Sequence, residues 1–379
     1  KMESYRESMI HEAIEANYSA PTHKIISDKV RSIVLSDDST IWLGTEDGLN
    51  IIDLNSNTIS LYQNNQISSS LSKNKILSII KDVTGNLWVG TYGKGINLFF
   101  NSSLNFKHYS SGVLNNSIDS IVETTDGQVW FYSENSGLNS VTSKTSDINI
   151  NIPEGVHFQL RSDSKNNLWI NTYPDGLSNI NSDELFAYNV ISKQTRKIKD
   201  WKEKSLYNRS YPFQLFNNKV WFIDTDGKLS SYNISTNKFY RYSNRGFESL
   251  KTFDIDVKNN AVWATSQDNQ LVSFDLSISS QNSSSIALHT LKGIKYLSTI
   301  KITSIKVSDS WVWLTSRQGI LLYNKKTKVT TYFNENNKLL SHSIDSVILD
   351  NQENAWFSTN GAISLINPNT EKVTNFSKD

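Results

Sequence analysis

The sequence predicts an all-β protein, an eight-bladed β-propeller built from four-stranded antiparallel blades. Tryptophans that open short apolar stretches recur at successive spacings of 46, 42, 39, 52, 42, 50 and 43 residues. These residues are Trp42, Trp88, Trp130, Trp169, Trp221, Trp263, Trp313 and Trp356. A repeat of about 45 residues that is rich in strand formers is typical of a propeller blade. A seven-bladed ring with one irregular extra unit is the alternative.

The second repeat shows the expected parts of a blade. Lys75 to Lys81 form a nearly continuous apolar run, which favours an innermost strand buried on both faces. A turn of Asp, Thr, Gly and Asn residues follows, and Leu87 to Thr91 are the expected second strand. Ile96 to Phe100 are the third strand, and Phe106 to Tyr109 the exposed outer strand.

A turn residue suited to positive φ follows each repeat tryptophan by five to seven positions. Seven repeats have glycine there: Gly48, Gly95, Gly137, Gly176, Gly227, Gly319 and Gly361. The exception is Asn269, and asparagine tolerates the left-handed region better than most residues. The pattern predicts a hairpin between the second and third strands of each blade. The tryptophans are then expected to pack between neighbouring blades, since a residue present in every blade serves the repeat rather than one ligand.

The chain is expected to have two parts. Residues 1–27 do not match the repeat, and their apolar residues fall near helical spacing, which predicts a short amphipathic helix from Glu3 to Asn17 in an N-terminal arm. The arm either lies against the propeller or is a remnant of a connection to an upstream membrane anchor. Residues 28–379 form the propeller.

Composition excludes several classes of function. The net charge is +1 and no basic stripe is present, so the sequence gives no sign of a nucleic-acid surface. Without cysteine there is no disulfide, thiolate metal site or cysteine nucleophile. The six histidines are scattered without a metal-ligand pair, and no G-x-S-x-G or phosphate-binding glycine motif occurs. We therefore expect no catalytic residues, no metal and no cofactor in the propeller.

One motif carries a family resemblance. Asp82 to Thr91 (DVTGNLWVGT), Asp37 to Thr45 (DDSTIWLGT) and the segments 116–121 (NSIDSI) and 343–348 (SIDSVI) resemble the two-component regulator propeller repeat. The resemblance implies an extracytoplasmic sensor region of a bacterial hybrid histidine kinase or diguanylate cyclase receptor. It also implies a periplasmic domain that senses a small polar ligand such as an oligosaccharide. The receptor would be a homodimer reaching the membrane through segments absent from this chain, and the propeller itself would not be an enzyme.

A ligand is expected where the turns between second and third strands meet the links between blades. Bulky or charged residues that depart from the repeat are the candidates: Trp201, Tyr92, Tyr173, Arg209, Arg317, Asp175, Glu134 and His342. Trp201 leads, because a tryptophan outside the repeat and in an exposed loop has no evident packing role. Ordinary exposed loop residues are the alternative for each. A protein-interaction scaffold and a carbohydrate-active enzyme are the alternative functions.

Overall fold

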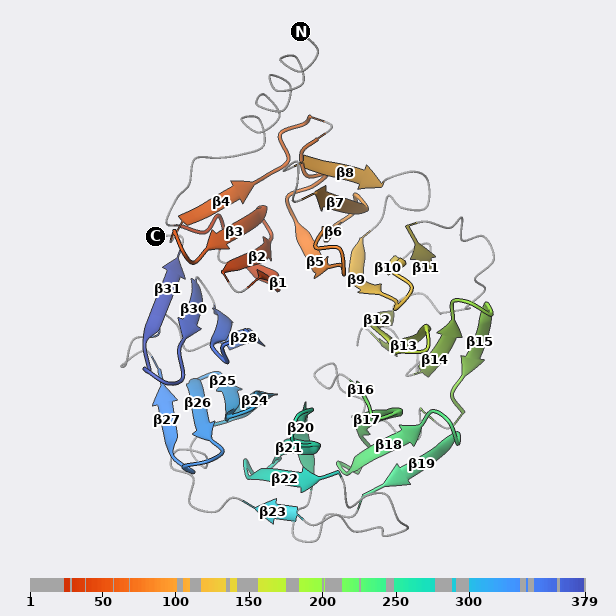
Figure 1. Cartoon of the computed structure of the whole chain (residues 1–379), viewed down its shortest axis with the longest axis vertical. Helices are drawn as coiled ribbons and strands as arrows, with labels where there is room; N and C mark the ends of the chain where they lie inside the picture. The colour runs from red at the N-terminus through yellow and green to blue at the C-terminus, as the bar shows by residue number, and fades with distance from the viewer. Residues whose placement is uncertain are drawn as a thin grey trace. The chain divides into compact units, whose positions relative to one another are not determined.

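The computed structural model describes residues 24–27, 29–37, 39–56, 58–67, 69–100, 105–109, 117–133, 137–141, 156–174, 184–199, 201, 213–224, 226–242, 249–276, 288–290, 300–334, 339, 344–359 and 362–377. The chain divides into two compact units, Lys1–Lys199 with Phe376–Asp379, and Asp200–Asn375. Each unit carries four antiparallel sheets whose strands follow one another in chain order (Figure 1). The eight sheets confirm the predicted eight-bladed β-propeller over the seven-bladed alternative.

The first unit holds blades 1 to 4. Their strands are β1 (Val30–Asp37), β2 (Thr40–Thr45), β3 (Leu49–Asp53), β4 (Thr58–Tyr62), β5 (Ile76–Lys81), β6 (Leu87–Thr91), β7 (Ile96–Phe100), β8 (Asn105–Tyr109), β9 (Ile118–Glu123), β10 (Val129–Ser133), β11 (Gly137–Ser140), β12 (Val156–Ser162), β13 (Asn167–Pro174), β14 (Glu184–Asn189) and β15 (Gln194–Lys197). Blade 3 has three strands within the described residues, and residues 142–155 after it lie outside them.

The second unit holds blades 5 to 8. Their strands are β16 (Gln214–Phe216), β17 (Lys219–Ile223), β18 (Leu229–Asn233), β19 (Lys238–Arg241), β20 (Leu250–Asp256), β21 (Ala261–Ser266), β22 (Leu271–Asp275), β23 (Leu288–Thr290), β24 (Ile302–Val307), β25 (Trp311–Ser316), β26 (Gly319–Asn324), β27 (Thr330–Phe333), β28 (Ile344–Leu349), β29 (Ala355–Thr359), β30 (Ala362–Ile366) and β31 (Val373–Ser377). All four sheets have four strands.

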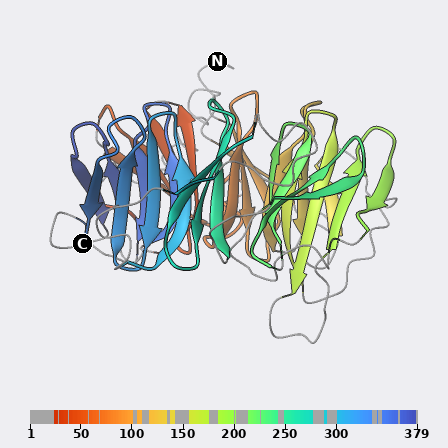
Figure 2. The ribbon, with the colours of Figure 1, turned by 90° about the horizontal axis from the view of Figure 1, so that it is seen from below.

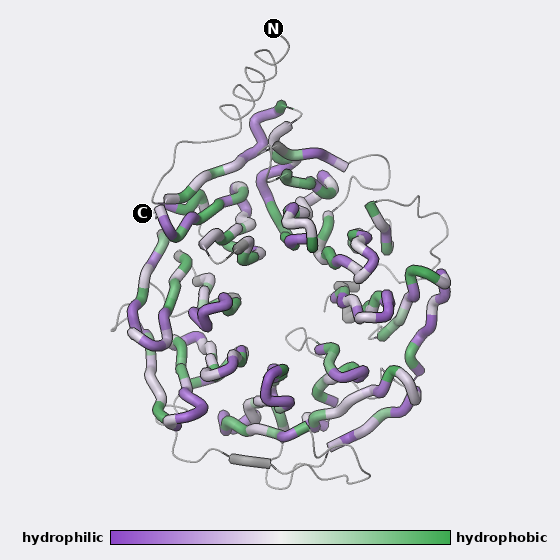
Figure 3. Tube along the Cα trace, in the orientation of Figure 1, coloured by the Kyte–Doolittle hydropathy of each residue, from purple (hydrophilic) through white to green (hydrophobic). Residues whose placement is uncertain are grey.

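In blade 2 the fully buried strand is the second, not the first. Every residue of β6 is buried, whereas β5 has two buried residues, three half-buried residues and an exposed Lys81. The expectation that this first strand is covered on both faces is therefore wrong, although the first strand of blade 6, β20, is buried at six of its seven residues. Successive side chains on a strand point to opposite faces, so a middle strand with a blade on either side buries both sets of side chains. The outer strand β15 is exposed along its length, and its residues are hydrophilic (Figure 3).

Alternation along the second strand joins neighbouring blades. Trp88 packs with Ile118 and Phe131 of blade 3, while Val89 points the other way into the cluster that contains Trp42. The same arrangement recurs between blades 3 and 4 and, in the second unit, between blades 5 and 6, 6 and 7, and 7 and 8. The ring of Trp42 lies edge-on to Phe99 of blade 2, with centroids 4.7 Å apart. The repeat tryptophans thus form the contacts between sheets.

In several blades, an aspartate in the turn between the first and second strands accepts a hydrogen bond from the tryptophan ring. Asp82 Oδ2 accepts a hydrogen bond from the Trp88 indole Nε1 at 2.9 Å, and its Oδ1 accepts from the backbone of Thr84 and Asn86. Asp163 binds Trp169 and Asp350 binds Trp356 in the same way. Blade 3 has Thr124 in place of the aspartate, and there the buried Trp130 indole N–H has no partner. The aspartate of the repeat therefore fixes both the turn and the ring.

The strands of a sheet run between two loop levels, seen from the side in Figure 2. We call the level of the turns between first and second strands the first-turn edge. The opposite level, with the turns between second and third strands and the links into each blade, is the second-turn edge. Near the second-turn edge the first strand has a β-bulge, between Val30 and Ser32 in blade 1 and between Ile76 and Ser78 in blade 2.

The serine after the bulge connects one blade to the next. Ser32 Oγ accepts from the backbone N–H of Ile79 at 3.0 Å, and Ser78 Oγ donates to the Ile118 carbonyl at 3.0 Å. Ser120 Oγ accepts from the Leu160 N–H at 3.3 Å. First strands of consecutive blades are not paired as a ladder, so these side chains satisfy backbone groups that the sheet leaves open.

The predicted hairpin turns are present. Gly227 has φ of 70°, and a Cβ there would lie 1.7 Å from Ser249 Oγ, so both conformation and space require glycine. Asn269 has φ of 59°, as expected for the residue that replaces glycine. The turns at Gly176 and Gly361 lie outside the described residues, as does the helix predicted from Glu3 to Asn17.

Asp82→Ala tests the role of the turn aspartate. Loss of the carboxylate leaves the Trp88 indole and two backbone N–H groups without their acceptor, so we expect the free energy of unfolding to fall by ~2–3 kcal/mol. Urea unfolding followed by tryptophan fluorescence measures it. Asp47→Ala is the control, because Asp47 is an exposed turn residue and its loss is expected to cost less than ~0.5 kcal/mol.

The pH dependence gives a second readout of the same variant. Burial raises the pKa of Asp82, but hydrogen bonds from Thr84, Trp88 and Asn86 outweigh it and hold the pKa below its ordinary value. A depressed pKa contributes stability above the unfolded value, ~3.9, that is lost as the pH falls through the folded value. The wild type is therefore expected to lose more stability than Asp82→Ala on acidification. Equal losses in the two proteins would contradict this role.

Candidate functional site

The candidate site begins at the turn between β2 and β3 on the second-turn edge. Thr45 donates from both its backbone N–H and its Oγ1 to the Gly48 carbonyl, at 3.0 and 2.7 Å. The backbone N–H of Glu46 donates to the Lys29 carbonyl at 3.1 Å, which ties this turn to the segment before β1. These bonds fix the direction from which the Glu46 side chain leaves the turn.

Three cations surround the Glu46 carboxylate. Arg31 donates to Glu46 Oε1, while Lys29 Nζ and Lys75 Nζ each lie 3.5 Å from a carboxylate oxygen. Arg31 is the extra residue of the β1 bulge, and Lys75 comes from the link into blade 2. The bulge thus places a guanidinium on the second-turn edge, in line with the role of bulges in redirecting side chains.

Tyr92 extends this group into the second blade. Its backbone N–H donates to the Lys75 carbonyl at 2.9 Å, and Lys75 Nζ lies 4.9 Å from the centroid of its ring. The Tyr92 side chain is 53% exposed, although it is a large aromatic. We call Lys29, Arg31, Glu46, Lys75 and Tyr92 the Glu46 cluster.

The electrostatics of the Glu46 cluster are those of an anion site with one internal counter-charge. The hydrogen bond from Arg31, with the charges of Arg31, Lys75 and Lys29 acting against burial, lowers the pKa of Glu46 to about 2. The carboxylate is therefore ionised near neutral pH, and three cations share one negative charge. All three cationic side chains are substantially exposed, so they can be reached from solvent.

The structure places only part of the sequence-predicted set. Tyr92 belongs to the Glu46 cluster, and Arg317 is exposed in the turn between β25 and β26 of the second unit. Tyr173 lies at the end of β13, where only its backbone is described. Glu134, Asp175, Arg209 and His342 lie outside the described residues.

The prediction that Trp201 lies exposed in a loop is wrong. Its side chain is 2% exposed, and its ring packs on Phe222 with centroids 4.6 Å apart. A packing role therefore exists, because this ring contacts the second strand of blade 5. Burial removes the argument from exposure that made Trp201 the leading ligand residue.

Sequence reasoning missed Lys29, Arg31, Glu46 and Lys75. One signal was available, since Lys29 and Lys75 both stand immediately before the first strand of their blades. Glu46 itself gave no signal, because Glu134, Asp175 and Asp224 also follow directly after the second strands of their blades. Their contact joins two blades, which the spacing within one repeat does not predict.

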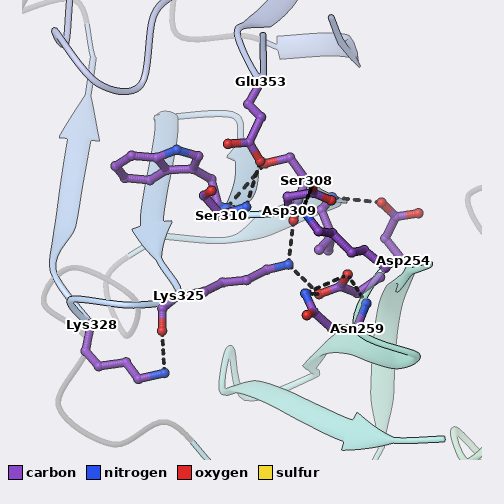
Figure 4. Close-up of polar contacts among 12 residues, drawn as sticks. Asp254, Asn259, Ser308, Asp309, Ser310, Lys325, Lys328 and Glu353 are labelled. Carbon is purple, nitrogen blue, oxygen red and sulfur yellow. Dashed lines mark hydrogen bonds and ion pairs between the residues drawn. The ribbon is translucent and has the colours of Figure 1, made fainter. Parts of the chain in front are cut away.

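A second polar cluster lies on the first-turn edge of the second unit (Figure 4). Lys325 pairs with Asp256, and their side chains are only 12% and 3% exposed. Asp256 also accepts two hydrogen bonds from the Asn259 side chain, and Lys325 donates to the Ser308 carbonyl. These groups satisfy one another and connect blade 6 to blade 7, so we assign the cluster a structural role.

Other chemistry is limited within the described part of the chain. No group of three or more His, Asp or Glu side chains there is arranged to hold a metal ion. Among those same residues, no helix has the length and apolar character needed to span a membrane.

Comparisons with known proteins agree with the fold and the repeat. Residues 70–93 match the family model described as two component regulator propeller. No curated protein sequence matches the chain significantly. The matched segment runs from the link before β5 to the turn that carries Tyr92, so it includes the part of the Glu46 cluster contributed by blade 2.

Several solved structures are similar to this chain. PorZ, a surface component of the type-IX secretion system of Porphyromonas gingivalis, has a TM-score of 0.51 at 13% identity, with 92% of this chain and 65% of that chain covered. The extracellular domain of BT4673 from B. thetaiotaomicron, assigned to a hybrid two-component system, has a TM-score of 0.41 at 17% identity. That match covers 92% of this chain and 60% of the other, so this chain spans about three-fifths of its length.

An enzyme is also among these structures. Virginiamycin B lyase from Staphylococcus aureus has a TM-score of 0.46 at 12% identity, with 90% of this chain and 96% of that chain covered. At these identities none of the likenesses assigns an activity to this chain.

Lys325→Met tests the structural role of the second cluster. The substitution keeps the side-chain stem but leaves the buried Asp256 carboxylate without its cation, so we expect the free energy of unfolding to fall by ~3–5 kcal/mol. Lys258→Met is the matched control, because the Lys258–Asp309 pair is exposed and screened by solvent, so its loss is expected to change stability far less. Chemical denaturation of both variants measures the difference. A Lys325→Met protein as stable as the control would show that this pair does not hold blades 6 and 7 together.

Proposed function

We propose that this chain is the ligand-sensing propeller of a transmembrane signalling receptor, that it is located in the periplasm, and that it binds a small polar ligand on the second-turn edge. The family-model match over residues 70–93 is the observation that carries the proposal. The repeat in that match supplies Lys75 and Tyr92, whose side chains are accessible to solvent.

The Glu46 cluster carries more cations than its one carboxylate can neutralise. Other polar side chains at the blade links are occupied by the fold: Asn97 accepts from the Ser72 N–H and donates to Ser72 Oγ, which holds the link before β5. The Glu46 cluster instead presents a half-exposed tyrosine ring and three cations that share one carboxylate to solvent. Aromatic faces and charged hydrogen-bond donors are the groups that bind sugars and organic acids.

A sensor requires that binding favours one state of the receptor over another. Lys29, Arg31 and Glu46 belong to blade 1 or the segment before it, whereas Lys75 and Tyr92 belong to blade 2. A ligand held by both groups would alter the contact between two blades. We propose that this change is passed on to the rest of the receptor.

Ligand screening tests the proposed function. Thermal denaturation of the purified chain is measured with panels of neutral and acidic oligosaccharides, amino acids and organic acids, and the reaction mixtures are checked for products. We expect one ligand class to raise the melting temperature with the logarithm of its concentration above Kd, with ~2.7 kcal/mol of stabilisation at 100-fold excess over Kd, and to be recovered unchanged. Absence of any ligand with this effect would contradict sensing, and conversion of the ligand into product would establish an enzyme instead.

A further inference from the structure

We propose that the Glu46 cluster recognises an acidic oligosaccharide, one whose sugar ring carries a carboxylate or sulfate group. The inference deepens the proposed sensing function and rests on it. Three observations on the first two blades support it: the charge of the cluster, the exposure of Tyr92, and the way the backbone fixes both.

The charge of the cluster favours an anion. Lys29 and Lys75 approach Glu46 only at 3.5 Å, while Arg31 makes the closer hydrogen bond. Arg31 is therefore the direct partner of the carboxylate, and the two ammonium groups are only partly neutralised. Each ammonium has three donors, so both retain donors for a ligand oxygen.

The neighbouring turn adds to the positive charge. Lys94 is exposed two residues after Tyr92, and Asp47 is exposed next to Glu46. With both turns included, the segment carries four cations, Lys29, Arg31, Lys75 and Lys94, and two carboxylates, Glu46 and Asp47, which leaves a formal charge of +2. A neutral ligand would use none of this excess, whereas an acidic one would neutralise it at a site that solvent already reaches.

Tyr92 indicates that the acid belongs to a ring. Its ring is 53% exposed and already has Lys75 Nζ 4.9 Å from its centroid. A sugar stacked on the open part of the ring would bring a substituent within reach of that ammonium. An isolated anion would use Lys29 and Lys75 but would leave the tyrosine uncovered, since aromatic rings offer little to a small hydrated ion.

The backbone keeps these groups in place before a ligand arrives. Glu46 is tied to Lys29, and Tyr92 to Lys75, through backbone hydrogen bonds of 3.1 and 2.9 Å. In both blades, therefore, the first residue of the turn after the second strand donates its N–H to the carbonyl of the residue just before the first strand. Preorganised groups lose little freedom on binding, which favours specific recognition.

Calorimetric titration with matched ligands tests the inference. The probes are a trisaccharide of galacturonic acid, the same trisaccharide fully methyl-esterified, and free sulfate. We expect the acid form to bind at least tenfold more tightly than the ester, with an affinity that falls as salt is added. Lys75→Gln is expected to weaken the acid form about tenfold and leave the ester unchanged, whereas Tyr92→Ala weakens both sugars. Lys326→Gln, an exposed lysine in the turn after β26, is the charge-matched control and changes neither.

The other possible results of the titration each overturn a different part of the inference. Equal binding of acid and ester, or an unchanged Lys75→Gln variant, would overturn the acidic ligand while leaving the sensing function intact. Sulfate bound as tightly as the trisaccharide would overturn the sugar and reduce the cluster to a simple anion site. If no sugar in either form binds, the inference fails, and the wider ligand panel decides the sensing function separately. Thermal denaturation of each variant confirms that it is folded.

Discussion

The packing of one large aromatic ring between adjacent sheets is the interaction on which each unit depends. A tryptophan on the second strand covers aliphatic residues of the next blade, as Trp88 does with Ile118 and Phe131. Burial of such a ring removes ~150–250 Å² from water, which is worth roughly 4–6 kcal/mol as an upper value. Exposed ion pairs contribute at most ~1 kcal/mol each. Because the ring also has a polar N–H, the turn must supply an acceptor, and Asp82 does so within the same hairpin.

The polar side chains at the two edges of the blades differ in the contacts that they make. On the first-turn edge, polar groups link neighbouring turns: Glu123 accepts from the Val83 N–H, and Glu353 accepts from the Ser310 N–H. Their hydrogen bonds serve the fold. On the second-turn edge of the first unit, the bulge in β1 and the link into β5 bring cations together beyond what one carboxylate neutralises. The binding site that we propose therefore lies on this second-turn edge.

The sequence predicts the structure within one repeat better than the contacts between repeats. The strands of the second repeat were predicted to within one residue, because spacing within a hairpin is local and recurs in every blade. The bond between Asp82 and Trp88 was equally readable, since the six-residue spacing recurs at Asp163 and Asp350. It was missed because the aspartate was interpreted only as a turn residue.

Contacts between blades were not predictable in the same way. Trp201 was expected to be exposed, but Phe222, its partner, lies in a separate strand with no periodic relation to it. Lys75 meets Glu46 only because two blades stand side by side. A single sequence gives the period of the repeat, and the identity of residues that meet across neighbouring repeats depends on the twist and offset between sheets.

Hydrogen exchange tests most directly whether side chains couple consecutive blades. The amides of Ile79, Leu160 and Val307 lie on first strands and donate to Ser32, Ser120 and Asp254 of the preceding blade. If these bonds hold the blades together, the three amides exchange as slowly as the ladder amides of the buried second strands. Rapid exchange at all three sites, with the second strands still protected, would contradict the account.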